Sequence, residues 1–262
     1  MNGGLPAMPT ADFSLEGKVA IVTGGSRGIG RSIAVGLAEH GADVALAARK
    51  PEALREAAEA VRATGRRALE APTNVRRAEE LRDLVQRTKS ELGRVDFLVN
   101  NAGTNPFFGA IHDLEERAFD VIMNTNVKAC HLLANFAREA MLEHGEGGAI
   151  VNVSSVGGYS ASDVIGAYSV SKAALIMLTQ VQAKTWGKDG IRVNAIAPGL
   201  IKTEFARALW DNPDIAAATA RESALHRIGE PDEMAGAVIY LCSPAASFVT
   251  GQTLVLDGGR LL

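Results

Sequence analysis

Short runs of Val, Ile and Ala alternate along this chain with longer amphipathic stretches, and this alternation constrains the fold more than any other feature. Several runs, such as residues 19–22, are apolar at every position, which is typical of strands buried on both faces of a parallel sheet. The predicted strands are residues 18–23, 43–48, 68–71, 95–100, 149–154, 192–197 and 253–256. Stretches with apolar residues near a period of 3.6 lie between them, at 29–40, 51–64, 78–92 and 168–186. The pattern predicts an α/β fold with a doubly wound, seven-stranded parallel sheet.

The chain of 262 residues fits one large domain, because no linker rich in Pro, Gly or Ser divides it after residue 15. We expect residues 1–15, which contain Gly3, Gly4, Pro6 and Pro9, to form a flexible N-terminus. Residues 16–262 are then the single domain. A helical segment at about 203–226 interrupts the last strand-helix-strand passage and is expected to lie beside the substrate.

Charge and cysteine content exclude several other classes of protein. The 27 basic and 30 acidic side chains are interspersed, so no extended positive surface is available to a phosphate backbone, and we expect no nucleic-acid partner. The two cysteines, Cys130 and Cys242, lie in apolar helical stretches, as expected of buried thiols in a reducing compartment. No stretch approaches the ~18 apolar residues of a membrane helix. These features predict a soluble, cytoplasmic protein with no membrane partner and no metal site.

A glycine-rich turn follows the first predicted strand and opens a helix, in the run Thr23-Gly24-Gly25-Ser26-Arg27-Gly28-Ile29-Gly30. Glycines at such a turn let the backbone approach a pyrophosphate, which then lies at the positive end of the helix. They can also be plain turn residues. The predicted cofactor contacts in this run are Gly24, Ser26, Arg27, Gly28, Ile29 and Gly30.

The end of the second predicted strand indicates which dinucleotide binds. An NAD site needs an Asp or Glu there for the ribose 2′-hydroxyl, whereas an NADP site needs a cation for the 2′-phosphate. This chain has Arg49 and Lys50 at that place, and the nearest acid, Asp43, begins the strand. Arg27 can supply a second guanidinium. We therefore predict NADP(H), although both arginines could instead be solvated surface charges.

Tyr168 and Lys172 are four residues apart and therefore share one helix face. A free Tyr titrates near pH 10, and an adjacent ammonium favours the phenolate, so Lys172 is expected to lower the pKa of Tyr168. Ser155 ends a predicted buried strand, at the edge where α/β sheets bind ligands. The three side chains predict an acid-base site at this edge.

These motifs resemble those of the short-chain dehydrogenases/reductases, which have a Rossmann fold, and the match runs from Leu15 to Gly259. The resemblance implies that Tyr168 transfers the hydroxyl proton and Ser155 hydrogen-bonds the substrate oxygen. It also implies that Lys172 binds the nicotinamide ribose. Asn126 would interrupt a helix and hold a water that joins Lys172 to solvent.

The same resemblance implies further cofactor contacts along the chain. Asn74 and Val75 match the pair at the adenine edge, where many relatives have Asp in place of Asn74. Residues 101–103 would line the adenine ribose, whereas Asn100 is expected to be a structural residue within the sheet. Residues after the sixth strand would meet the nicotinamide carboxamide and phosphate. The complete set comprises Asn101, Ala102, Gly103, Pro198, Gly199, Ile201 and Thr203.

The loops at the strand ends and the inserted segment offer an apolar set of side chains to a substrate. Its members are Pro106, Phe107, Phe108, Tyr159, Phe205, Leu209 and Trp210, about half of which could instead be core or subunit contacts. Apolar walls suit a hydrophobic carbonyl compound. Several of these segments are similar to those of NADP-dependent carbonyl and retinal reductases of the same family, which favours a carbonyl reductase.

Two other functions compete with this one. A 3-oxoacyl-[acyl-carrier-protein] reductase has nearly the same glycine-rich turn, but the basic residues it offers its acidic carrier are replaced here by Glu143, Glu146 and Asp189, with Lys188 and Arg192 nearby. A catalytically silent, dinucleotide-sensing scaffold normally lacks one of the four site residues, and all four are present. The resemblance also implies a homotetramer formed by helices near 126–144 and 168–186 and by the C-terminal strand.

Overall fold

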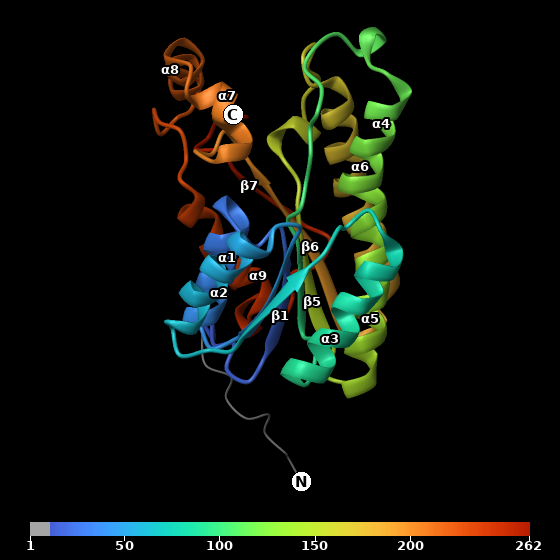
Figure 1. Cartoon of the computed structure of the whole chain (residues 1–262). Coiled ribbons are helices and arrows are strands. Elements are labelled where there is room, and N and C mark those ends of the chain that lie inside the picture. Colours follow the sequence, from blue (N-terminus) through green and yellow to red (C-terminus); the bar gives the residue numbers. More distant parts are fainter. Residues whose placement is uncertain (1–10) are drawn as a thin grey trace.

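The computed structural model describes residues 11–262, and it consists of one seven-stranded sheet between two layers of helices (Figure 1). All strands are parallel, in the order β3-β2-β1-β4-β5-β6-β7. Their bounds are β1 Val19–Thr23, β2 Asp43–Ala48, β3 Ala68–Pro72, β4 Phe97–Asn100, β5 Gly148–Val153, β6 Ile191–Pro198 and β7 Thr253–Leu256. The predicted α/β fold is confirmed, and predicted and observed strand limits differ by at most two residues.

One face of the sheet is covered by α1 (Gly28–Glu39), α2 (Pro51–Arg62) and α9 (Ala235–Cys242), and the other by α3 (Ala78–Leu92), α5 (Ala129–His144) and α6 (Gly166–Trp186). Each layer has its own apolar core. The first core contains Ile33, Leu54 and Val238, and the second contains Leu84 and Leu133. Because β1 is buried on both faces, its residues alternate between the two cores, as the continuous apolar run predicts.

Residues 12–15 belong to the folded domain, which corrects the prediction of a flexible N-terminus over 1–15. Leu15 is fully buried, and its N–H donates to the His40 carbonyl at 2.8 Å. The Phe13 ring lies 6.3 Å from the Tyr240 ring on α9. Apolar burial therefore orders this segment, while residues 1–10 lie outside the described residues.

The segment inserted between β6 and α9 contains a short 3-10 turn at Glu204–Ala206, then α7 (Arg207–Trp210) and α8 (Pro213–Glu222). Figure 1 shows α7 and α8 together at one end of the molecule. The Ser223 hydroxyl donates to the Gly258 carbonyl at 2.9 Å, which ties the end of the segment to the chain just after β7. Within residues 11–262, no helix is long and apolar enough to cross a membrane.

Candidate active site

The parallel sheet brings the carboxyl ends of β1, β4, β5 and β6 to one edge. The glycine-rich turn follows β1, residues 101–103 follow β4, Ser155 follows β5, and Pro198 ends β6. Helix α6 starts beside this edge and carries Tyr168 and Lys172. Such an edge, at the place where the strand order reverses, is where α/β proteins bind ligands.

The glycine-rich turn has the geometry of a phosphate cradle. Gly24 and Gly28 have φ values of +64° and +53°, which glycine adopts without strain. A Cβ on Gly24 would lie 2.7 Å from the Asn101 amide nitrogen, and one on Gly30 would collide with the Gly24 carbonyl. No side chain of residues 11–262 caps α1 at Arg27, so the first N–H groups of the helix remain available to an anion. The turn therefore fits a dinucleotide pyrophosphate.

Two polar residues hold this turn, and sequence reasoning missed both roles. The Asn101 amide donates to the Thr23 carbonyl at 2.8 Å and to the Gly24 carbonyl at 3.2 Å. The Thr23 hydroxyl accepts from the Asn101 backbone N–H at 3.0 Å. The position of Thr23 directly before the glycines is the signal that could have identified it. Asn100 is structural, as predicted, because its amide donates to Asn152 on β5 at 2.9 Å.

Three cations lie near the turn and the end of β2. Arg27, Arg49 and Lys50 are exposed, and none forms an ion pair within the described part of the chain. Asp43 lies at the other end of β2, where it accepts from Arg67 at 2.7 Å. The chemistry of this donor set suits a phosphate better than a ribose hydroxyl.

The other predicted cofactor contacts lie around the same edge. Val75 and Ala102 line one small pocket together with Thr23. The Asn74 side chain accepts from the Arg76 backbone N–H at 3.2 Å. Ile201 is buried, and the Thr203 methyl lies 3.2 Å from where a Gly28 Cβ would be, so the start of the inserted segment meets the glycine-rich turn.

Tyr168, Lys172 and Ser155 come together as predicted. Lys172 is buried, its Nζ donates to the Val153 carbonyl at 2.8 Å, and the same atom lies 5.5 Å from the centroid of the Tyr168 ring. Ser155 Oγ and the Tyr168 ring lie side by side, 3.4 and 3.7 Å from where a Gly157 Cβ would be, and Ser155 lowers the pKa of the phenol. The Ser154 hydroxyl, a role the sequence did not indicate, donates to the Lys172 carbonyl at 2.9 Å.

The pKa of Tyr168 moves opposite to the predicted direction. Burial raises it to about 12, and the hydrogen bond with Ser155 offsets only part of the rise. Burial also lowers the pKa of Lys172 to about 8, because the ammonium loses hydration. The phenol is therefore protonated at neutral pH, the state needed to donate a proton to a carbonyl oxygen.

Asn126 lies in a π-helical turn, Asn124–Lys128, that joins α4 (Glu116–Met123) to α5, so the predicted local break in the helix is present. Its side chain is fully buried and contacts the loop after β4. The Thr104 N–H donates to Asn126 Oδ1 at 2.9 Å, and Asn126 Nδ2 donates to the Thr104 carbonyl at 3.0 Å.

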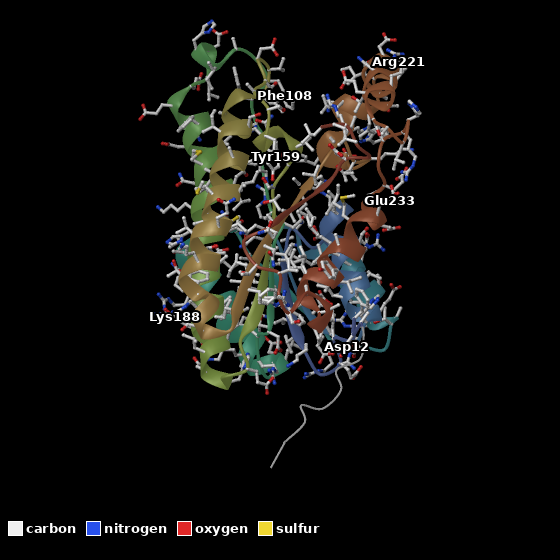
Figure 2. The ribbon with its side chains drawn as sticks, turned by 180° about the vertical axis from the view of Figure 1, so that it is seen from behind. Asp12, Phe108, Tyr159, Lys188, Arg221 and Glu233 are labelled. Atoms are coloured by element: carbon white, nitrogen blue, oxygen red, sulfur yellow. The ribbon has the colours of Figure 1, made fainter. Side chains whose placement is uncertain are left out.

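The predicted substrate residues lie in three different settings. The Phe205 ring, at the start of the inserted segment, lies 6.2 Å from the Tyr168 ring. Phe108 and Tyr159 are exposed at the end of the molecule where α8 lies (Figure 2). Phe107 instead packs on Gly109, and Trp210 donates from its indole N–H to the Thr203 carbonyl at 2.6 Å. These last two side chains therefore stabilise loops that border the site.

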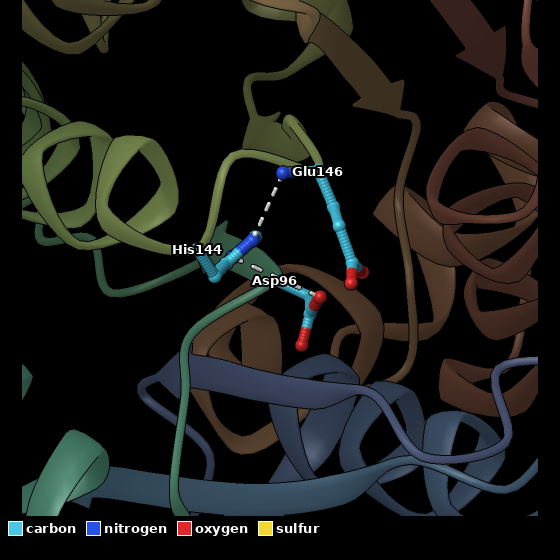
Figure 3. A group of neighbouring side chains, drawn as sticks. All are labelled: Asp96, His144 and Glu146. Atoms are coloured by element: carbon cyan, nitrogen blue, oxygen red, sulfur yellow. Dashed lines mark hydrogen bonds and ion pairs between the residues drawn. The ribbon is translucent and has the colours of Figure 1, made fainter.

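A second group of polar side chains lies at the opposite edge of the sheet, where Asp96, His144 and Glu146 meet (Figure 3). Lys18 and Arg94 both bind Glu146, at 2.8 and 2.6 Å, and these ion pairs hold the pKa of Glu146 at about 2. Arg94 also binds Asp96 at 2.6 Å. Because two cations already engage the carboxylates, this cluster is an ion-pair network that does not suit a metal ion.

Comparison with known proteins agrees with this geometry. Residues 24–260 match the family model described as Enoyl-(Acyl carrier protein) reductase. The chain is 40% identical, over 247 residues, to "Dehydrogenase/reductase SDR family member 4" of Bos taurus, covering 94% of this chain and 88% of the relative. A Burkholderia cenocepacia J2315 gluconate 5-dehydrogenase in complex with NADP and tartrate has a TM-score of 0.91 and 34% identity, over 96% of this chain and 98% of that one. A 7α-hydroxysteroid dehydrogenase complexed with NADH and 7-oxo glycochenodeoxycholic acid has a TM-score of 0.92 and 32% identity, over 97% of this chain and 98% of that one.

The parallel sheet, the phosphate cradle and the Ser155, Tyr168 and Lys172 group define an NAD(P)-dependent oxidoreductase of the Rossmann type. Solved relatives contain either NAD(H) or NADP. The chain belongs to the short-chain dehydrogenase/reductase family.

Proposed function

We propose that this protein is an NADP(H)-dependent carbonyl reductase that acts on hydrophobic ketones or aldehydes and, in reverse, on secondary alcohols. The observation that carries the proposal is the contact of the Phe205 ring with the Tyr168 ring, 6.2 Å apart, beside Ser155. An apolar wall thus borders the group that would donate the proton. The names of the curated relatives, which are dehydrogenase/reductases, support the same class of reaction.

The chain's own residues perform the proton chemistry and the binding. When bound, NADPH would supply the hydride for the carbonyl carbon. Ser155 and Tyr168 hydrogen-bond the carbonyl oxygen, and the Tyr168 phenol gives that oxygen its proton. Lys172 would hold the nicotinamide ribose with the N–H donors that its bond to Val153 leaves available. Phe205 presents an apolar ring beside the proton donor.

The choice of NADP(H) over NAD(H) follows from charge. Arg27, Arg49 and Lys50 surround the place where the adenosine 2′-phosphate would lie, and their side chains form no ion pairs within residues 11–262. Charge-assisted hydrogen bonds from guanidinium groups to phosphate are stronger than neutral ones. A free ribose hydroxyl would offer these three cations only a neutral acceptor.

The charged residues that the sequence offered as evidence against a 3-oxoacyl-[acyl-carrier-protein] reductase do not lie beside the active site. Glu143, Glu146 and Asp189 lie at the amino-terminal edge of the sheet, away from Tyr168, and each is in an ion pair. Arg192 is not available to a carrier, because its guanidinium donates to the carbonyls of Leu241, Cys242 and Ser243. These charges therefore do not decide what enters the site.

The test is NADPH oxidation across aliphatic, aryl and retinoid carbonyls alongside an acetoacetyl thioester. A carbonyl reductase turns over several free carbonyls with a higher kcat/KM than the thioester. Preference for the thioester would assign the competing function. Binding of NADPH without turnover of any member would instead favour a dinucleotide-sensing scaffold.

Arg49→Asp tests the cofactor proposal. The substitution removes a cation from the 2′-phosphate and places an anion beside it, so the ratio of kcat/KM for NADPH over NADH falls, by about tenfold or more. Arg27 remains and retains part of the preference. The matched control is Lys188→Asp, which lies just before β6 at the amino-terminal edge of the sheet and leaves the ratio unchanged (Figure 2). A wild-type ratio below one, or an equal fall in both variants, contradicts the proposal.

A further inference from the structure

The first turn of α6 carries Tyr168 as its third residue, yet this turn has little support from its own helix. The N-cap residue, Ile165, has no side-chain hydrogen bond to the first turn, and the Ser162 hydroxyl accepts only from the Val164 and Ile165 N–H groups just before that turn. The first N–H groups of a helix have no partner within the helix, and an uncapped first turn is more prone to fray. A proton donor at this place needs another means of fixation.

Ser171 provides one. Its side chain is fully buried one turn after Tyr168, and the Ser171 hydroxyl donates to the Tyr168 carbonyl at 2.7 Å. The same hydroxyl oxygen accepts from Asn126 Nδ2 at 3.0 Å. One side chain therefore joins the backbone of the proton donor to the π-helical turn before α5.

Asn126 extends this connection to the loop after β4. Its two Nδ2 hydrogens go to the Thr104 carbonyl and to Ser171, and its Oδ1 accepts from the Thr104 N–H. An Asn amide has two donor hydrogens and two acceptor positions, so only one acceptor position remains for a water. The Asn126 amide thus links the π-helical turn to the loop after β4 and to α6. Its bond to Ser171 is the one that leads to Tyr168.

We propose that Ser171 is a positioning residue, which fixes the Tyr168 phenol against Ser155 by tying the first turn of α6 to Asn126. The inference rests on the proposed proton-donor role of Tyr168. Misplacement of a reacting group by about 1 Å can cost 10²-fold in rate, so one hydrogen-bonded bridge has a measurable effect on turnover.

Ser169 supplies a matched control on the same helix. It is buried like Ser171, but its hydroxyl has no hydrogen-bond partner within residues 11–262. Removal of such a hydroxyl leaves no partner unsatisfied. Ser169→Ala and Ser171→Ala therefore make the same chemical change, and only the second breaks the bridge.

Steady-state kinetics provide the first measurement. In Ser171→Ala, kcat falls at least tenfold, while KM and the Kd of NADPH stay within twofold of the wild type. Ser169→Ala keeps the wild-type values. A kcat in Ser171→Ala within twofold of that in Ser169→Ala would overturn the proposal, and so would a matching rise in the Kd of NADPH.

Amide hydrogen exchange provides a measurement that does not need a substrate. Peptides covering residues 166–173 exchange faster in Ser171→Ala than in the wild type and in Ser169→Ala, and equal exchange would overturn the proposal. If the wild type reduces none of the carbonyls, the proposed function fails, and the exchange result still decides the role of Ser171.

If Ser171→Ala does not fold, Ser171→Cys replaces it. The thiol fills a similar volume but is a weaker donor and acceptor. We therefore expect kcat to fall about threefold, which is less than the fall from a complete loss of the bridge. Wild-type kcat in folded Ser171→Cys would overturn the proposal.

Discussion

At the scale of single residues, the site depends on the protonation of Tyr168. Tyr168→Phe keeps the ring that contacts Phe205 and removes the hydroxyl that we propose protonates the carbonyl oxygen. We expect kcat to fall about 10²–10⁴-fold, the usual contribution of general acid catalysis. The Kd of NADPH, measured by fluorescence titration, should stay within threefold. Turnover within threefold of the wild type would show that another group donates the proton.

Lys172 gives a prediction for stability. Burial lowers its pKa to about 8, so from about pH 8 to the usual Lys value of 10.5 the unfolded chain binds more protons at this residue than the folded chain does. The free energy of unfolding therefore increases as the pH rises through that window, by up to about 3 kcal/mol. Urea unfolding at pH 7.5 and 10 measures the gain, which Lys172→Met should lack. An equal pH dependence in both proteins contradicts the lowered pKa.

Some properties of these residues were predictable from sequence and others were not. The spacing of Tyr168 and Lys172 indicates one helix face, and the place of Ser155 after an apolar strand indicates the sheet edge. The direction of the Tyr168 pKa depends on how deeply tertiary packing buries the ring, which spacing does not reveal. Ser171 lies within the same motif, but its partner Asn126 is 45 residues away.

At the scale of elements, the glycine-rich turn is the most constrained segment. Gly24→Ala would place a Cβ 2.7 Å from the Asn101 amide nitrogen, at a residue with φ of +64°. We expect a loss of about 1–3 kcal/mol in unfolding free energy and at least tenfold weaker NADPH binding. Gly236→Ala, in the exposed part of α9 with open space around its Cβ, should instead stabilise by about 0.5–1 kcal/mol. Equal effects of the two substitutions would contradict the cradle geometry.

The strands and the long helices could be predicted because their periodicity is local to each segment. The π-helical turn at Asn124–Lys128 and the short helix α4 have no comparable local pattern, since tertiary bonds from Asn126 to Thr104 stabilise the turn. The same reasoning explains the error at Leu15, whose burial against the domain is a tertiary contact.

At the scale of the whole molecule, we propose a homotetramer. Val170, Met177 and Val181 are each more than half exposed, and their spacing places them on one face of α6. Contiguous exposed apolar side chains mark association surfaces. Met177→Glu should therefore lower the mass in light scattering after size exclusion, whereas Arg55→Glu on α2, in the other helical layer, should not. A wild-type monomer would contradict the proposal.

The central place of β1 has a consequence for folding kinetics. Its five residues are all buried, and it pairs with both β2 and β4, although the Val19 N–H and the Asp96 carboxylate that accepts from it, just before β4, are 77 residues apart in the chain. Until β4 pairs with β1, one edge of the uncharged Val-Ala-Ile-Val segment of β1 has no strand partner. Unpaired edges of this kind promote aggregation. Non-local parallel pairing is also slow. Refolding yield should therefore fall as protein concentration rises, because intermolecular association competes with closure of the sheet around β1.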